Sequence, residues 1–195
     1  SFVLNPHGML THQMPCFDPA LVHVDFEKGE DGWQAVPGEK AALPDTWEVD
    51  YRVMVEALRD YMGKTGFRQV VLGLSGGIDS ALVAAIAADA LGPDNVRCVM
   101  LPSRFTSEVS LEDAADVARR LGTRLDTVPI GAAHEAVLAT LGPIFEGTEP
   151  GITEENIQSR LRGVMLMALS NKFGEMLLTT GNKSEVAVGY ATIYG

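Results

Sequence analysis

The sequence predicts an α/β fold, a doubly wound domain whose parallel sheet carries helices on both faces, preceded by a short β-rich N-terminal segment. From residue 46 onward, short apolar runs alternate with longer stretches of helical periodicity, which is the order expected of βαβ units. A glycine-rich turn, Ser75-Gly76-Gly77, separates the first of these runs from the helix that follows it. Open parallel sheets bind ligands at such turns, beyond the carboxyl ends of their strands.

The composition narrows the function before any motif is considered. The 195 residues include 15 basic and 26 acidic side chains, a net charge of −11, which argues against a nucleic-acid partner. No apolar run approaches the roughly 20 residues of a membrane span, and residues 1–6 lack the basic start of a signal peptide. Cys16 and Cys98 form neither a zinc pattern nor a disulfide framework, so we expect a cytoplasmic protein without a membrane partner.

Residues 1–45 differ in character from the remainder of the chain. Residues 2–4 and the alternating stretch 21–26 predict short strands, and the segment 27–44, rich in glycine, proline and charge, predicts a linker. Two short strands cannot bury a core by themselves. This part is therefore either the edge of something larger or a segment that docks on the rest.

Helices and strands then follow in order. Val49, Val53 and Leu58 fall near helical spacing, and Gly63 and Gly66 mark the end of that helix. The rest of the sequence predicts strands at 70–74, 96–101, 125–130 and 176–180, of which the first is buried. It predicts helices at 80–91, 110–121, 132–141 and 154–173, of which the first is rich in alanine. A polar loop is predicted at 142–151.

The strongest chemical signal is the segment Ser75-Gly76-Gly77-Ile78-Asp79-Ser80. Its two glycines allow a tight turn and close approach to a phosphate, which the amides and the positive end of the next helix would then face. Ser75 and Ser80 would add hydroxyl donors. The carboxylate of Asp79 would repel a phosphate unless a magnesium ion lay between the two.

Two common phosphate-binding motifs do not fit this turn. The Walker pattern requires a lysine in the loop, and the dinucleotide fingerprint requires a different glycine spacing. A glycine-rich turn of purely structural purpose is the alternative, because such turns are frequent between strands and helices.

The loop resembles that of the ATP-pyrophosphatase superfamily, whose adenine nucleotide α-hydrolase fold cleaves ATP to AMP and pyrophosphate. Several further motifs occur in the order found in NAD synthetases. They are Gly66-Phe67, Gly73 to Leu82, Met100 to Ser107, Glu155 to Arg162, Gly181-Asn182-Lys183-Ser184-Glu185 and Gly189 to Gly195. The resemblance covers most of residues 46–195 and implies an incomplete synthetase domain there.

The family resemblance implies a ligase that amidates deamido-NAD to NAD through an adenylated intermediate, with ammonia normally supplied from glutamine. It implies a bound Mg²⁺, held by Asp79 and Glu185, and ATP as co-substrate. The implied ATP-binding residues are Gly73, Leu74, Ser75, Gly76, Gly77, Ile78, Asp79, Ser80 and Thr180, and the implied deamido-NAD residues are Asn156, Arg160, Arg162 and Glu185.

Each of these assignments has a plainer alternative. Two arginines on one helix, Arg160 and Arg162, can bind phosphates or a carboxylate, but they also fit a solvated helix with local ion pairs. Glu185 also fits an exposed loop carboxylate, and Lys183 fits either a phosphate contact or a surface lysine. His134 fits a surface or packed residue better than a catalyst, and Cys98 fits an inert buried thiol.

Residues 1–8 and 22–26 resemble the end of a nitrilase-type glutaminase domain, which precedes the synthetase domain in glutamine-dependent NAD synthetases. The catalytic residues of such a glutaminase would lie before Ser1, so we expect none within this segment. The family also implies a homo-oligomer. The alternatives are another amidotransferase of the superfamily, such as a GMP synthetase, and a nucleotide-binding module without turnover.

Overall fold

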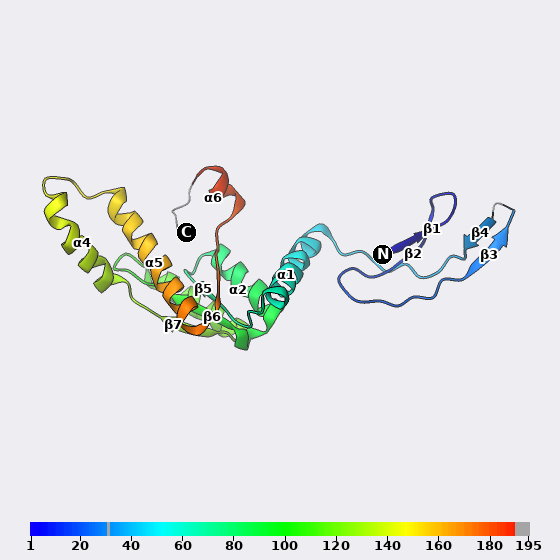
Figure 1. Cartoon of the computed structure of the whole chain (residues 1–195), viewed down its shortest axis with the longest axis horizontal. Helices are drawn as coiled ribbons and strands as arrows, with labels where there is room; N and C mark the ends of the chain where they lie inside the picture. Colours follow the sequence, from blue (N-terminus) through cyan, green and yellow to red (C-terminus); the bar gives the residue numbers. More distant parts are fainter. Residues whose placement is uncertain (31, 190–195) are drawn as a thin grey trace. The chain divides into compact units, whose positions relative to one another are not determined.

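The computed structural model of the chain describes residues 1–30 and 32–189, so the resembling stretch at 190–195 lies outside the described residues. The chain forms two compact units, Ser1–Glu56 and Ala57–Gly195. The first unit contains two antiparallel hairpins. The second unit contains the parallel sheet and its helices, except that helix α1 (Thr46–Thr65) begins in the first unit (Figure 1).

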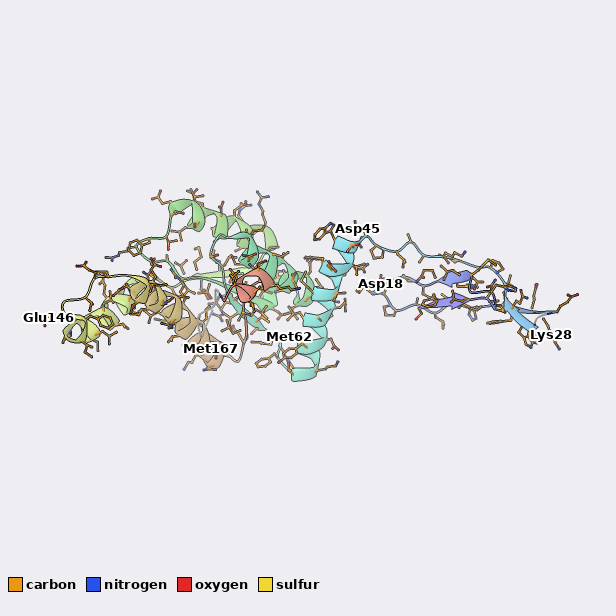
Figure 2. The ribbon with its side chains drawn as sticks, turned by 90° about the horizontal axis from the view of Figure 1, so that it is seen from above. Asp18, Lys28, Asp45, Met62, Glu146 and Met167 are labelled. Atoms are coloured by element: carbon orange, nitrogen blue, oxygen red, sulfur yellow. The ribbon has the colours of Figure 1, made fainter. Side chains whose placement is uncertain are left out.

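The hairpins of the first unit are short. Strand β1 (Phe2–Leu4) pairs with β2 (Leu10–Gln13), and the Asn5 carboxamide oxygen closes the turn between them by accepting bonds from the backbone of His7 and Met9. Strand β3 (Phe26–Gly29) pairs with β4 (Gly32–Ala35), and Figure 2 shows Lys28 near the turn of that hairpin.

Two predictions for this unit are wrong. Residues 21–25 form no strand, and Leu21 is 91% exposed, because an alternating pattern makes a strand only where a partner strand and a buried face exist. The predicted linker 27–44 instead holds most of the β3–β4 hairpin. Its glycines mark a turn: Gly32 has a φ of +101°, which favours glycine.

The second unit confirms the predicted parallel sheet. Its strands are β5 (Val70–Gly73), β6 (Val96–Met100), β7 (Arg124–Thr127) and β8 (Met176–Leu178), in the spatial order β7-β6-β5-β8. All three strand pairs are parallel. The chain proceeds from β5 outward to β7 and then returns to the opposite side of β5. The boundary between β5 and β8 is therefore the topological switch point of the sheet.

Helices cover both faces of this sheet. Helices α1 (Thr46–Thr65), α2 (Ile78–Leu91) and α3 (Glu108–Leu121) supply one apolar layer, and α5 (Ile152–Phe173) supplies the other. Alternate residues of β5 point to opposite faces: Leu72 packs in the first layer and Val71 in the second, both without exposed surface. Burial on both faces explains why the strand is apolar throughout.

Several shorter elements complete the unit. Helix α4 (Gly131–Phe145) continues through Pro143 past its predicted end and lies beside α5, with Glu146 at the end of α4 (Figure 2). A 3₁₀ turn (Pro93–Asn95) precedes β6, and a five-residue helix, α6 (Lys183–Ala187), follows β8. The sequence did not predict α6, because one turn is too short to show periodicity. None of the described helices is both long enough and apolar enough to cross a membrane.

A buried charged cluster crosses the sheet on the α5 face. The guanidinium of Arg97 in β6 donates to Glu175 over 2.8 Å and to Asp126 in β7 over 2.9 Å. It also lies 4.4 Å from the ring centroid of Phe173. Glu175 is 3% exposed, and its second oxygen has no hydrogen-bond partner within the part of the chain that the structure describes. Arg97 is therefore the cation that compensates this buried carboxylate.

Replacing Arg97 with methionine is expected to destabilise the chain by about 3–5 kcal/mol, because Glu175 would be left as an uncompensated buried charge. The measurement is urea unfolding followed by circular dichroism. The double variant Arg97→Met/Glu175→Gln should recover part of the loss. Arg120→Ala, which removes an exposed pair with Asp116, should cost less than about 1 kcal/mol. Equal losses in the two single variants would contradict this account.

Candidate functional site

The candidate site lies at the carboxyl end of β5, at the switch point of the sheet. The glycine-rich loop leaves β5 there and enters α2 at Ile78. Strand β8 runs parallel to β5, with Leu178 beside Leu72, so the segment after β8 emerges at the same edge. This edge is where doubly wound sheets bind their ligands.

Hydrogen bonds within the loop hold both of its serines. The Ser80 hydroxyl donates to the Gly77 carbonyl over 2.9 Å and accepts from the Ser75 amide over 3.2 Å. The hydroxyls of Ser75 and Ser80 are 3.1 Å apart and share a hydrogen bond in which either can be the donor. The Ser75 hydroxyl also accepts from the Gly77 amide over 3.2 Å. Both serine hydroxyls therefore contribute to the shape of the loop, and their role as donors to a phosphate stays a prediction.

Gly76 is the residue that the loop requires most strictly. Its φ is +84°, and a Cβ at this position would lie 2.4 Å from the Ser110 carbonyl oxygen. Ser110 belongs to the first turn of α3, whose N-cap is Ser107. The loop therefore packs directly, backbone against backbone, on the start of α3, and only glycine meets both the conformational and the steric demand.

The backbone amides at the start of α2 carry the anion-binding potential of the loop. The N-cap residue, Gly77, has no side chain, and no side-chain capping bond forms there. The first amides of a helix have no partner within the helix, and the helix dipole adds positive potential at this end. An anion held by this turn would satisfy these donors.

Two carboxylates meet at this edge through Asn182. The Asn182 carboxamide nitrogen lies 3.4 Å from an oxygen of Asp79, while its carboxamide oxygen accepts from the Glu185 amide over 2.9 Å. The Asn182 amide in turn donates to a Glu185 carboxylate oxygen over 3.0 Å. Asp79 is exposed and Glu185 is half-buried. The structure thus places both predicted metal ligands in contact with Asn182, Asp79 through its side chain and Glu185 through its backbone amide.

The carboxylates of Asp79 and Glu185 fit a magnesium ion that is bound partly by the protein and partly by substrate phosphates. No group of three or more histidine, cysteine or acidic side chains within the described residues could hold a metal by itself. Mg²⁺ commonly binds through one or two carboxylates plus substrate phosphates and water. Asp79 and Glu185 fit that mode, because Asp79 lies in the first turn of α2 and Asn182 contacts both carboxylates.

The other predicted nucleotide residues occupy varied positions. Thr180 is half-buried just beyond β8, on the loop edge, and Ile78 is 80% exposed at the first position of α2. Leu74 is buried in the core, so only its backbone faces the edge. Gly73 has a packing reason to be glycine, because a Cβ there would lie 3.3 Å from Leu166 of α5.

Helix α5 carries the predicted deamido-NAD residues on different sides. Arg162 donates to the Leu101 carbonyl over 3.1 Å, just after β6, and burial lowers the pKa of its guanidinium. Arg160 is exposed, and Asn156 is half-buried. The two arginines are two positions apart on the helix and so do not share a face. Arg162 is anchored against the sheet edge, whereas Arg160 is turned to solvent.

Neither Asn182 nor Ser110 is assigned a role by the sequence alone. Asn182 followed by Glu185 is the pattern of a capping box, which the structure shows at α6 and which could have drawn attention to Asn182. No local pattern marks Ser110, since its contact with Gly76 is made by the backbone. His134 is buried, in agreement with a packed residue, and burial raises the pKa of the Cys98 thiol, in agreement with an inert one.

Comparison with protein families and curated proteins gives consistent matches. The family model described as NAD synthase matches residues 50–195. A glutamine-dependent NAD(+) synthetase of Rhodobacter capsulatus is 67% identical over all of this chain, which spans 35% of that protein. Another, from Xanthomonas campestris pv. campestris, is 56% identical over 85% of this chain and 32% of its own length. The chain therefore spans about a third of the length of these relatives.

Solved structures share the architecture. The glutamine-dependent NAD+ synthetase of Acinetobacter baumannii, in complex with ADP, matches 97% of this chain and 36% of its own with a TM-score of 0.92 at 44% identity. The NH3-dependent NAD synthetase of Campylobacter jejuni matches 78% of this chain and 64% of its own with a TM-score of 0.70 at 30% identity. An NMN synthetase of Francisella tularensis matches 78% of this chain and 61% of its own with a TM-score of 0.71 at 28% identity.

Gly76→Ala is expected to destabilise the chain by about 2–4 kcal/mol, because the new Cβ meets the Ser110 backbone in a left-handed conformation. Gly63→Ala is the matched control: it lies in α1 with open space around it, and alanine there should stabilise the helix by about 0.5–1 kcal/mol. Urea unfolding of both variants provides the comparison. A neutral effect of Gly76→Ala would show that the loop is free to move away from α3.

Proposed function

We propose that this chain, which belongs to the NAD synthase family, carries the synthetase step in which deamido-NAD is amidated to NAD at the cost of ATP. The observation that carries the proposal is the pairing, at one sheet edge, of the uncapped α2 amides with the Asn182-linked carboxylates of Asp79 and Glu185. Such an edge fits a polyphosphate held together with a divalent cation.

The proposed reaction has two steps. An oxygen of the nicotinate carboxylate attacks the α-phosphorus of ATP, and the bond from that phosphorus to the bridging oxygen breaks, releasing pyrophosphate. Ammonia then attacks the acyl carbon of the adenylated substrate, loses a proton, and displaces AMP to leave the amide. Neither step needs a side chain of this chain as nucleophile, so the site acts by positioning and by stabilising charge.

Different residues of the chain would bind the pyrophosphate, the metal ion and the dinucleotide. The amides at the start of α2 face the negative charge that accumulates on the departing pyrophosphate, and the glycine turn lets the backbone approach it closely. Asp79 and Glu185 would hold Mg²⁺, which neutralises phosphate charge when bound. Arg162 donates through its Nε to the Leu101 carbonyl, and its other guanidinium donors, which bond no group in residues 1–30 and 32–189, would bind an anionic part of the dinucleotide. The ADP named in the Acinetobacter baumannii complex supports an adenine nucleotide as ligand of this fold.

The remaining parts of the proposal concern the whole protein. We assign residues 1–45 to the end of a nitrilase-like glutaminase domain with its linker and residues 46–195 to the synthetase domain. The relatives named glutamine-dependent support an upstream glutaminase that delivers ammonia. A homo-oligomer completes the proposed assembly. Two unpaired cysteines, Cys16 and Cys98, support a reducing cytoplasm as its compartment.

The test compares acids that could be amidated. The complete protein is supplied with ATP, Mg²⁺ and ammonia, together with deamido-NAD, nicotinate mononucleotide or xanthosine monophosphate, and AMP release is measured. We expect AMP and pyrophosphate with deamido-NAD. AMP release only with nicotinate mononucleotide would indicate the activity named for the similar NMN synthetase. AMP release only with xanthosine monophosphate would indicate a GMP synthetase. ATP binding without AMP release in any arm would leave a binding module.

Asp79→Asn is expected to weaken ATP binding in the presence of Mg²⁺ by at least about 10-fold, because a cation ligand is lost. In EDTA the same variant should bind ATP as well as the wild type or better, because the repulsion between Asp79 and the phosphates has been removed. Isothermal titration with and without metal separates the two effects. Asp94→Asn makes an equal change of charge in the exposed turn before β6. It should leave the ATP affinity unchanged both with Mg²⁺ and in EDTA. Unchanged ATP affinity of Asp79→Asn in the presence of Mg²⁺ would remove Asp79 from the metal site.

A further inference from the structure

We propose that Asn182 is a positioning residue that holds the carboxylates of Asp79 and Glu185 together so that one divalent cation is bound by both. This inference rests on the proposed function, since it specifies how the same site is built. Asn182 links Asp79, 103 positions away along the chain, to the first turn of α6.

Each of the two carboxylates accepts a hydrogen bond from Asn182 through one of its oxygens. Asn182 donates to one oxygen of Asp79 through its side chain and to one oxygen of Glu185 through its backbone amide. Within residues 1–30 and 32–189, the remaining oxygen of each carboxylate accepts no hydrogen bond. One oxygen of each carboxylate is therefore occupied, and one is left for a cation.

An asparagine is suited to this position for electrostatic reasons. Two carboxylates brought together repel each other, and a neutral donor between them lowers that repulsion without contributing a competing positive charge. A lysine or arginine there would itself neutralise the pair and oppose cation binding. An aspartate would add a third negative charge and lose the donor to Asp79. The carboxamide supplies an acceptor for the α6 cap and, on its other atom, a donor for Asp79.

Serine at position 182 separates the two roles of the side chain. Serine is an N-cap of similar quality to asparagine, so Asn182→Ser should retain the bond from the Glu185 amide. The backbone amide of residue 182 still reaches the Glu185 carboxylate, because that bond does not involve the side chain. The shorter hydroxyl side chain does not extend to Asp79. The variant thus removes the link to Asp79 and little else, whereas Asn182→Ala removes the cap as well.

The experiment measures how much Mg²⁺ the complete protein requires to bind ATP, by isothermal titration with ATP at a series of Mg²⁺ concentrations. For Asn182→Ser we expect the Mg²⁺ concentration at half-maximal ATP affinity to rise about 10-fold, the size typical when a residue that orients a metal ligand is lost. Saturating Mg²⁺ should restore the wild-type affinity and kcat, which a collapse of the local fold would not allow. Asn182→Ala should show a larger shift and incomplete recovery.

Asp45→Ser is the matched control. The Asp45 carboxylate accepts from the Glu48 amide at the start of α1, so this change also exchanges one good cap for another, on a helix that carries none of the site residues. It should leave the Mg²⁺ requirement unchanged. A wild-type requirement in Asn182→Ser would overturn the positioning role and leave the proposed function intact. Absence of Mg²⁺-dependent ATP binding in the wild type would overturn the proposed function, and this inference with it.

Discussion

The contact between Gly76 and the backbone of Ser110 is the constraint on which the arrangement of the site depends. Because the loop packs on the first turn of α3, its position is tied to β6, the strand that leads into α3. The left-handed conformation of Gly76 turns the chain from β5 into α2, whose N-terminus has no side-chain cap among the described residues. The orientation of the anion-binding donors therefore follows from a close approach of two backbones, which any side chain at position 76 would prevent.

The order of the strands explains why the carboxylates meet this loop. Asp79 follows the loop directly, but Glu185 is more than 100 positions later in the chain and reaches the edge only because β8 returns to the side of β5 opposite β6. The residues after β8 then emerge beside the start of α2. Asn182 makes the connection at the first turn of α6. The topology of the sheet thus brings both candidate metal ligands to this edge, where the side chain of Asn182 contacts Asp79 and its backbone amide contacts Glu185.

The sequence was informative where one local pattern carried the information. Continuous apolar strands such as 70–74 and the glycines of the loop predicted the sheet and the ligand edge, and Glu185 was placed on that edge from its position after the last strand. Contacts between distant segments were not accessible in this way: the Asn182–Asp79 bond and the anchoring of Arg162 on Leu101 depend on tertiary packing. The N-terminal strand at 21–26 was mispredicted because alternation does not reveal whether a partner strand exists.

The bonds among Ser75, Gly77 and Ser80 have a consequence for the thermodynamics of binding. The Ser80 hydroxyl bonds the Gly77 carbonyl and the two serine hydroxyls bond each other, so these bonds hold the shape of the loop without a nucleotide. The backbone of this segment then loses its conformational entropy during folding. Because little further ordering is needed on binding, this loss lowers the affinity for a ligand only slightly. A preorganised cradle of this kind offers its amides to an incoming anion without first having to reorganise them.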